Sequence, residues 1–308
     1  MNNRTPRIAL TVVTRNRLSL LQRCIGALRM QAVPETALVV VNNGSTDGTE
    51  QWLASQGDIV VITQGNLGSA GGQKTAMEYA VQNGFDAVFT MDDDCFPQHD
   101  ALTRILAAWM AKDDRESWVL NSLVLDPDVK GAMSFGLWDG AILGVRHAQT
   151  FYQSLSEVPP SRIVGNLYTG WGCVFNGTLV PTALLKKIGY PRAEFFIRGD
   201  EVEFFYRVRR HGNIATVTDS IVWHPGAASI DETLPNWKRY FSVRNEVIIN
   251  REYFPSIKTT KLYLGLRALR YRILAAVTRE KEVNRVMAIA ISDALNGDFS
   301  RDAFNQKT

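Results

Sequence analysis

Short runs rich in β-branched residues alternate with helical patterns over the first hundred residues, and this alternation constrains the fold more than any other feature. The expected strands cover residues 8–13, 38–41, 59–62 and 87–91. The expected helices cover residues 18–30, 49–55, 71–82 and 100–112. Such alternation is typical of an α/β fold with a mostly parallel sheet flanked by helices. Ligands of such sheets bind beyond the carboxyl ends of the strands.

Each expected strand ends in a polar, glycine-rich or acidic loop. These loops cover residues 14–17, 42–49, 65–72 and 92–94. Turn chemistry explains one such loop, but four at the same edge of a sheet predict a binding crevice.

Composition narrows the class of protein. With 308 residues, 45% of them hydrophobic and 21% charged, the chain can bury a full core. A net charge of +3 is too small to imply a nucleic-acid partner. The three cysteines, Cys24, Cys95 and Cys173, are far apart and suggest neither a disulfide framework nor a zinc site. We find no cleavable signal and no run of about 18 apolar residues, so we expect a cytoplasmic protein.

The second half is less regular and ends in a basic helix. We expect strands at 118–124 and 172–175, helices at 181–188 and 202–211, and a boundary that separates domain 1–255 from a helical tail, 256–308. No acid lies between Glu252 and Glu280. Basic and apolar residues share this interval: Lys258, Lys261, Arg267, Arg270, Arg272 and Arg279, with Leu262, Leu266, Leu269, Ile273 and Val277. This helix either packs on the main domain or docks peripherally on anionic lipid at the inner face of the cell membrane.

Three adjacent acids, Asp92, Asp93 and Asp94, follow the fourth expected strand. Adjacent carboxylates repel one another unless a cation or solvent relieves them. In an extended chain Asp92 and Asp94 point to one side, so together they could hold Mg²⁺ or Mn²⁺. The alternative is a solvated acidic turn that caps the next helix.

A second acidic cluster and a histidine complete the candidates. Asp200 and Glu201 precede an expected helix, where acids are also favoured by the helix dipole, and either could act as a general base. Glu203 is spaced to pair with Arg207. His224 follows an expected strand and could bind the metal, although a single histidine is more often structural.

Two other phosphate-binding motifs are disfavoured. Residues 68–75 nearly match the ATPase phosphate loop, but Gln73 occupies the second obligatory glycine position. No Gly-x-Gly-x-x-Gly follows the first strand, which disfavours a dinucleotide-dependent dehydrogenase.

The order of these motifs resembles glycosyltransferase family 2, the inverting enzymes of the GT-A fold. The resemblance rests on residues 13–17 (VTRNR), 42–49 (NNGSTDGT), 66–72 (NLGSAGG) and 91–94 (MDDD). By this resemblance the nucleotide-sugar site comprises Thr14, Arg15, Asn16, Asn43, Asn66, Gly68, Asp92 and Asp93. Asp92 and Asp94 would hold the metal and the diphosphate.

Later segments resemble the bacterial galactofuranosyl- and rhamnosyl-transferring branch: residues 195–204 (FFIRGDEVEF), 222–224 (VWH) and 240–245 (YFSVRN). The resemblance makes Glu201 the base, His224 a metal ligand, and Trp171 with Gly172 neighbours of the acceptor. The branch commonly has Asp where this chain has Glu201, so Asp200 stays an alternative base.

The sequence therefore predicts an inverting, metal-dependent glycosyltransferase that moves galactofuranose, rhamnose or a related hexose. The expected donor is a UDP-sugar, with a dTDP-sugar as second choice, and the acceptor is a hydroxyl of a cell-surface glycan or a lipid-linked glycan. Oligomeric state stays open, and a homo-oligomer is compatible with the sequence. The alternatives are a sugar nucleotidyltransferase and a non-catalytic nucleotide- or carbohydrate-binding module.

Overall fold

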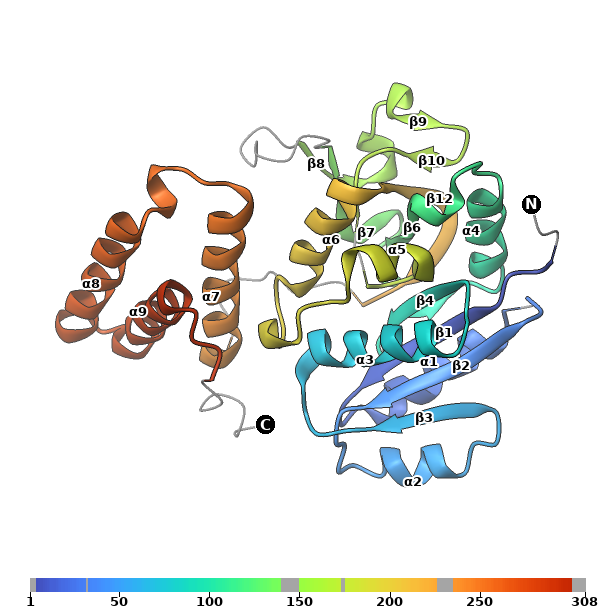
Figure 1. Cartoon of the computed structure of the whole chain (residues 1–308), viewed down its shortest axis with the longest axis horizontal. Helices are drawn as coiled ribbons and strands as arrows, with labels where there is room; N and C mark the ends of the chain where they lie inside the picture. Colours follow the sequence, from blue (N-terminus) through green and yellow to red (C-terminus); the bar gives the residue numbers. More distant parts are fainter. Residues whose placement is uncertain (1–3, 32, 140–149, 173–174, 226–234, 301–308) are drawn as a thin grey trace.

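A computed structural model describes residues 4–31, 33–139, 150–172, 175–225 and 235–300. Its centre is a mixed sheet with the strand order β3-β2-β1-β4-β11-β6-β12-β10-β9 (Figure 1). The first four strands of this order are parallel to one another: β1 (Ile8–Thr14), β2 (Thr36–Asn42), β3 (Ile59–Thr63) and β4 (Ala87–Asp92). The predicted parallel sheet is confirmed, and each strand extends slightly beyond its expected bounds.

Helices cover both faces of this sheet because side chains alternate along each strand. Ile8, Leu10 and Val12 of β1 face the core shared with α1 and α4, whereas Ala9 faces the core shared with α3, α5 and α6. These helices, with the short α2, are α1 (Leu18–Arg29), α2 (Thr49–Ala54), α3 (Gly68–Gln82), α4 (Ala101–Met110), α5 (Thr182–Ile188) and α6 (Asp200–His211). The result is a three-layer arrangement with the strand ends open at one edge.

The second half of the sheet departs from simple alternation. β11 (Thr178–Pro181) runs antiparallel between β4 and β6 (Trp118–Leu125), while β6 pairs in parallel with β12 (Asn213–Trp223). The remaining strands are β5 (Phe96–Pro97), β7 (Ala132–Asp139), β8 (Thr150–Ser154), β9 (Ile163–Val164) and β10 (Leu167–Tyr168). The strand expected at 172–175 falls partly outside the described residues, at 173–174, so Cys173 does too.

Three C-terminal helices form a separate group beside the sheet (Figure 1). They are α7 (Asn236–Tyr253), α8 (Lys261–Val277) and α9 (Lys281–Asn296). α7 lies on the N-terminal side of the boundary expected at residue 255, yet it packs against α9 through the same core cluster that contains Ile248 and Ile291. Among the described helices, none combines the length and the apolar character needed to cross a bilayer.

Candidate active site

The acidic triplet lies where β4 ends, beside the end of β1. Parallel pairing sets Val13 opposite Asp92, so Thr14 comes next to the acids. The Thr14 hydroxyl donates to the Asp93 carboxylate over 2.7 Å, and both side chains are buried. The strand register therefore fixes Asp93 as an internal anchor, with Asp92 and Asp94 more accessible on either side.

Arg17 neutralises this cluster, and the sequence interpretation had given it no role. Its guanidinium lies 3.1 Å from the Asp93 carboxylate and 2.7 Å from that of Asp94. It belongs to the same strand-end loop as Thr14, so its place in the 13–17 motif was the available signal. Half of its side chain stays accessible, so this cation could also face an anionic ligand.

His224 reaches the triplet from the end of β12. Its backbone N–H donates to the Leu125 carbonyl, and its Nε2 lies 3.5 Å from the Asp94 carboxylate. Asp94, Cys95 and His224 each offer a ligand atom, and these atoms lie within 4.8 Å of one another. The structure thus brings together the predicted ligands Asp94 and His224. In the described part of the chain, the compact group contains Cys95 in place of the third predicted ligand, Asp92.

The electrostatics of this group suit a cation. Burial and the neighbouring charges of Asp94 and Asp93 raise the pKa of Asp92 to about 7. Burial opposes ionisation of Asp94, but contact with His224 and Arg17 lowers its pKa. Burial alone would lower the pKa of His224, whereas the carboxylates of Asp94 and Asp92 raise it. The negative potential that attracts a proton to His224 would equally attract a divalent metal, so the residues present fit Mn²⁺ or Mg²⁺.

The second acidic cluster lies at the start of α6, close enough to the first for their charges to interact. Glu201 raises the pKa of Asp92, and Asp92 raises that of Asp200. Asp200 is 1% exposed, and burial, followed by Glu201, raises its pKa well above the usual value. Glu201 is partly exposed. The two clusters therefore share one region, in which Asp200 is buried with a raised pKa and Glu201 beside it is partly exposed.

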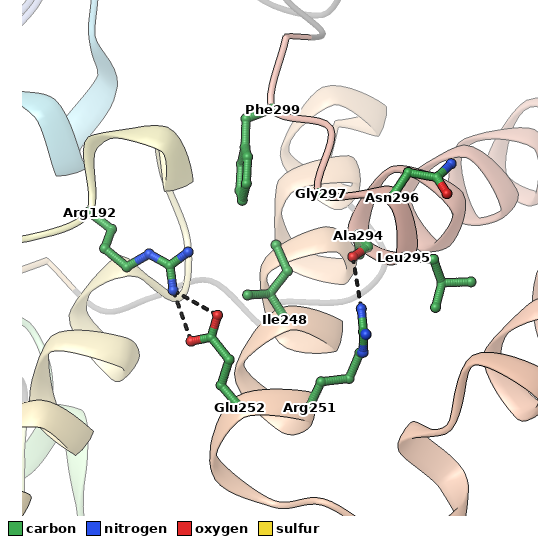
Figure 2. A pocket seen from close by; sticks show the side chains of 9 residues that line it. All are labelled: Arg192, Ile248, Arg251, Glu252, Ala294, Leu295, Asn296, Gly297 and Phe299. Carbon is green, nitrogen blue, oxygen red and sulfur yellow. Dashed lines mark hydrogen bonds and ion pairs between the residues drawn. The ribbon is translucent and has the colours of Figure 1, made fainter.

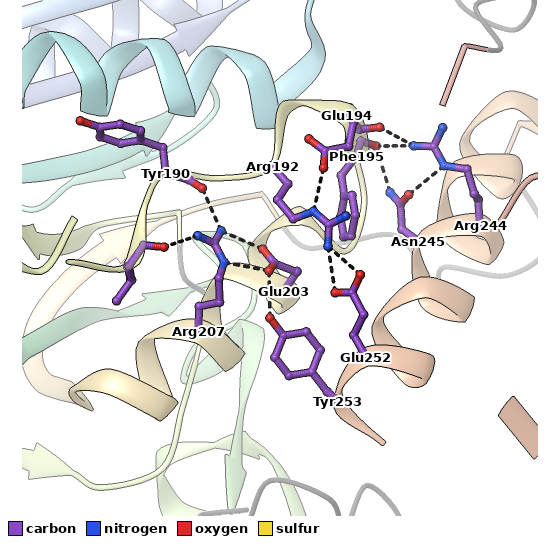
Figure 3. Close-up of polar contacts among 11 residues, drawn as sticks. Tyr190, Arg192, Glu194, Phe195, Glu203, Arg207, Arg244, Asn245, Glu252 and Tyr253 are labelled. Carbon is purple, nitrogen blue, oxygen red and sulfur yellow. Dashed lines mark hydrogen bonds and ion pairs between the residues drawn. The ribbon is translucent and has the colours of Figure 1, made fainter. Parts of the chain in front are cut away.

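The predicted pair Glu203 and Arg207 is confirmed, one turn into α6 (Figure 3). Both guanidinium contacts are short, at 2.7 and 2.8 Å, and the Tyr253 hydroxyl adds a hydrogen bond of 2.9 Å to Glu203. Arg207 also donates to the carbonyls of Ile188 and Tyr190. This buried network ties α6 to α7 and gives Glu203 a structural partner.

The predicted nucleoside loops hydrogen-bond to one another. The Thr46 N–H donates to the Asn16 side-chain oxygen over 2.7 Å, and the Asn43 amide donates to the Gly68 carbonyl over 2.9 Å. The Asn66 side chain accepts from the Gly68 N–H, and Arg15 lies half-buried in the first loop. Thr14, Asn16, Asn43, Asn66 and Gly68 thus form one connected rim at the sheet edge. Their predicted contacts with a nucleotide stay predictions.

Two further cations, Lys238 and Arg198, lie near the acids, and the sequence analysis assigned neither of them to the site. Burial, then Arg198 and Arg17, lower the pKa of Lys238, whereas Asp94 raises it. Lys238 stands at the start of α7 and Arg198 in the loop before α6, so only folding brings them to Arg17. Arg198 and Arg17 are near enough to Lys238 to lower its pKa, and such a group of cations favours binding of an anion.

The predicted acceptor residues lie in a well-packed position. Trp171 is 8% exposed and its ring stacks on Phe205 of α6, with 3.9 Å between the centroids. Its indole N–H is buried without a partner among the described residues. Gly172 is also buried, and a Cβ there would lie 3.2 Å from Leu137. The indole N–H is the part of Trp171 best suited to a polar ligand.

A separate hollow of about 410 Å³ lies between the 192 segment, α7 and the end of α9 (Figure 2). Arg192 and Glu252 form an ion pair on one side, and Arg251 donates to the Ala294 carbonyl on the other. None of its lining residues belongs to either acidic cluster. The acidic and polar residues at the strand ends are therefore the candidate active site.

Comparisons with known proteins agree with this geometry. Residues 10–118 match the model of Glycosyl transferase family 2. The chain is 30% identical to galactofuranosyltransferase GlfT1 of Mycobacterium tuberculosis, over 89% of this chain and 90% of that protein.

Solved structures share the fold at low identity. GalNAc-T7 with UDP, GalNAc and Mn²⁺ has a TM-score of 0.60 at 12% identity, with 99% of this chain and 58% of that chain covered. The mannosyltransferase PcManGT of Pyrobaculum calidifontis, in complex with GDP-Man and Mn²⁺, has a TM-score of 0.52 at 16% identity, with 97% and 88% covered. The identity to GlfT1 over nearly the whole length, together with the match to the family model, shows that the chain is a glycosyltransferase and belongs to glycosyltransferase family 2.

Proposed function

We propose that this enzyme transfers a hexose, with galactofuranose first among the candidates, from a UDP-linked donor to an acceptor hydroxyl, with inversion at the anomeric carbon. One observation carries the proposal. Asp94 and His224 lie 3.5 Å apart beside Asp92, and Glu201 is near enough for its charge to contribute to the raised pKa of Asp92, which supports a single site. An inverting displacement needs the leaving group and the base on opposite faces of the sugar.

Asp94 and His224, with Asp92 beside them, would hold a divalent metal. Bound there, Mn²⁺ or Mg²⁺ would supply charge neutralisation at the diphosphate leaving group. Imidazole among the ligands favours Mn²⁺, because Mg²⁺ is bound chiefly by oxygen atoms. Arg17, Arg198 and Lys238 would contact the same diphosphate from the side of the protein.

The difference in environment supports Glu201 as the base. A base must be ionised and must reach the acceptor hydroxyl. Asp200 is buried and its raised pKa favours the protonated form, which is a poor base, whereas Glu201 is partly exposed. Glu201 would take the hydroxyl proton while the oxygen attacks the anomeric carbon.

The donor and the acceptor follow from the relatives. Galactofuranose is the sugar in the name of the relative that is similar over most of its length, and UDP is present in the GalNAc-T7 structure. A dTDP-sugar is the second candidate. We expect the acceptor to be a glycan of the cell envelope, free or lipid-linked.

The test is to incubate the purified protein and Mn²⁺ with UDP-galactofuranose, UDP-galactopyranose or dTDP-rhamnose and an oligosaccharide acceptor. We expect release of the nucleoside diphosphate only with the productive donor, which we predict to be UDP-galactofuranose, and proton NMR of the product should show the anomeric configuration opposite to that of the donor. Retained configuration would contradict the role of Glu201. A sugar nucleotidyltransferase would instead release pyrophosphate from a nucleoside triphosphate and a sugar 1-phosphate, so release of pyrophosphate in a parallel incubation with UTP and galactose 1-phosphate would contradict sugar transfer.

A second part of the proposal concerns α8, which we place on an anionic lipid surface, within the predicted tail 256–308. The apolar side chains expected in this helix face outward: Leu262 is 74% exposed, Leu269 is 51% and Val277 is 72%. Leu264 and Ala268 are buried instead. Exposed aliphatic groups flanked by Arg270 and other cations suit insertion among anionic head groups, and a second copy would bring like charges together. Such contact would make the enzyme peripheral on the inner face of the membrane.

Liposome flotation can test this placement. The Leu266→Ser, Leu269→Ser, Ile273→Ser variant should lose binding to phosphatidylglycerol vesicles, while Val164→Ser, at a 70% exposed residue outside the tail, should not. Binding that is unchanged in the triple variant would contradict the proposal. So would a dimer in ultracentrifugation that the triple variant abolishes while vesicle binding stays, because α8 would then be a subunit contact.

A further inference from the structure

The backbone that leads to Glu201 has an unusual conformation. Phe196 has φ 65° and ψ −63°, Arg198 has φ 67°, and Gly199 has φ 84°. The Ile197 N–H donates to the Phe195 carbonyl over 2.7 Å, which closes a γ-turn of the rare, strained hand. Non-glycine residues keep such conformations only where the surrounding structure holds them. Something outside the segment 194–199 must therefore fix it.

Asn245 of α7 supplies most of the restraint (Figure 3). Its side-chain amide donates to the carbonyls of Phe195, Ile197 and Arg198 over 2.9, 3.1 and 2.7 Å. Asn245 is completely buried. One side chain thus organises the carbonyls of almost the whole turn before α6.

Arg244 extends the restraint and orients Asn245. Its Nε donates to the Asn245 side-chain oxygen over 3.1 Å, which turns the amide NH₂ toward the segment. The guanidinium also donates to the carbonyls of Glu194 and Phe195. It is 1% exposed and lies over the rings of Tyr240 and Phe241. A buried guanidinium is costly unless its hydrogen bonds are made, so this arrangement is rigid.

The opposite side of the segment contacts the glycine-rich loop of the donor site. The Phe196 carbonyl accepts from the Ala70 N–H over 3.1 Å. A Cβ at Gly68 would lie 2.1 Å from the same carbonyl oxygen, so glycine is required at this close approach. The segment therefore lies between α7 and the start of α3, in contact with both.

We propose that Arg244 and Asn245 are positioning residues for sugar transfer. They hold the backbone of 194–199 in its strained form, and this form places Glu201 opposite the donor loop. The proposal rests on the role of Glu201 given above. The proposal gives a role to the 240–245 motif, which contains neither the metal ligands nor the base.

The test compares Asn245→Ala with Glu252→Ala as a matched control. Glu252 lies on the same helix and pairs with Arg192, just upstream of the strained segment. We expect Asn245→Ala to lower kcat about 10- to 100-fold, because the base shifts from its productive position, with UDP affinity changed less than about twofold. Hydrogen exchange should accelerate over 194–200 in this variant alone. The control should keep kcat within about twofold.

Arg244→Lys is a milder second variant, because it keeps the buried charge and loses part of the fork of donors. A kcat that stays normal in either folded variant would overturn the proposal. So would a loss of kcat that only follows the unfolded fraction measured by circular dichroism, because the residues would then support the fold alone. Normal turnover in Glu201→Gln would instead overturn the proposed base, and so distinguishes the two failures.

Discussion

The two walls of the proposed active site, the acids that follow β4 and Glu201 of α6, are built in different ways. Asp93 and Asp94 stand at the end of β4, where strand register and the hydroxyl of Thr14 fix them and Arg17 neutralises them. Glu201 stands after a strained segment that α7 holds from outside. The first wall is set by regular secondary structure, and the second by side chains more than forty residues further along the chain. Substitutions should therefore act locally on the first wall and at a distance on the second.

Loss of Asp94 should have the largest effect. Asp94→Ala removes the carboxylate that faces both His224 and Arg17, so we expect transfer to fall about 10⁴-fold. Steady-state kinetics with added Mn²⁺ measures this. Asp219→Ala, at an exposed residue paired with Arg104, serves as the control. Full activity of Asp94→Ala in the presence of chelator would show that the first wall does not act through a metal.

Glu201→Gln should lower turnover about 10³-fold, because an amide cannot accept the acceptor proton. Asp200→Asn should cost far less, since burial raises the pKa of Asp200 and favours its protonated form. Comparison of kcat for the two variants at saturating donor shows which acid of the second wall is the base. The opposite ranking would move the base to Asp200.

Removal of Arg17 should have an intermediate effect on the first wall. Arg17→Gln leaves Asp93 and Asp94 without their cation, and we expect kcat/KM to fall about 10- to 100-fold. Arg29→Gln is the matched control, since Arg29 ends the helix that Arg17 precedes and pairs with exposed Asp58. An equal loss in both variants would mean that the helix, and not the charge, matters.

The smallest effect concerns stability and pH. The folded protein raises the pKa of Asp200, so the folded state binds the proton more tightly than the unfolded chain. This contribution to stability is complete below the unfolded pKa of about 4 and is lost as pH rises toward the folded pKa. Asp200→Asn should therefore gain Tm over the wild type as pH rises from about 4 to about 8. A difference that stays constant with pH would show that Asp200 is ionised in the fold.

Local pattern predicted the first wall well and the second only in part. The alternation of strands and helices places residues 14–17 and 92–94 together, because parallel strands end at one edge. The i, i+4 spacing likewise predicted the pair Glu203 and Arg207. The meeting of Arg198, Lys238 and Arg17 could not be predicted, because these residues join only through α7 and tertiary packing. For α8, periodicity predicted the helix, but burial of Leu264 and exposure of Leu269 depend on its neighbour α9.

The central claim is that the first wall binds the metal and the diphosphate, whereas the second wall supplies the base. Calorimetric titration of UDP at fixed Mn²⁺ tests this claim most directly. Wild type, Asp94→Ala and Glu201→Gln would be compared at one pH. We predict that Glu201→Gln binds UDP like the wild type, and that Asp94→Ala loses the Mn²⁺-dependent part of the affinity. Equal binding by Asp94→Ala, or a matching loss in Glu201→Gln, would contradict the account.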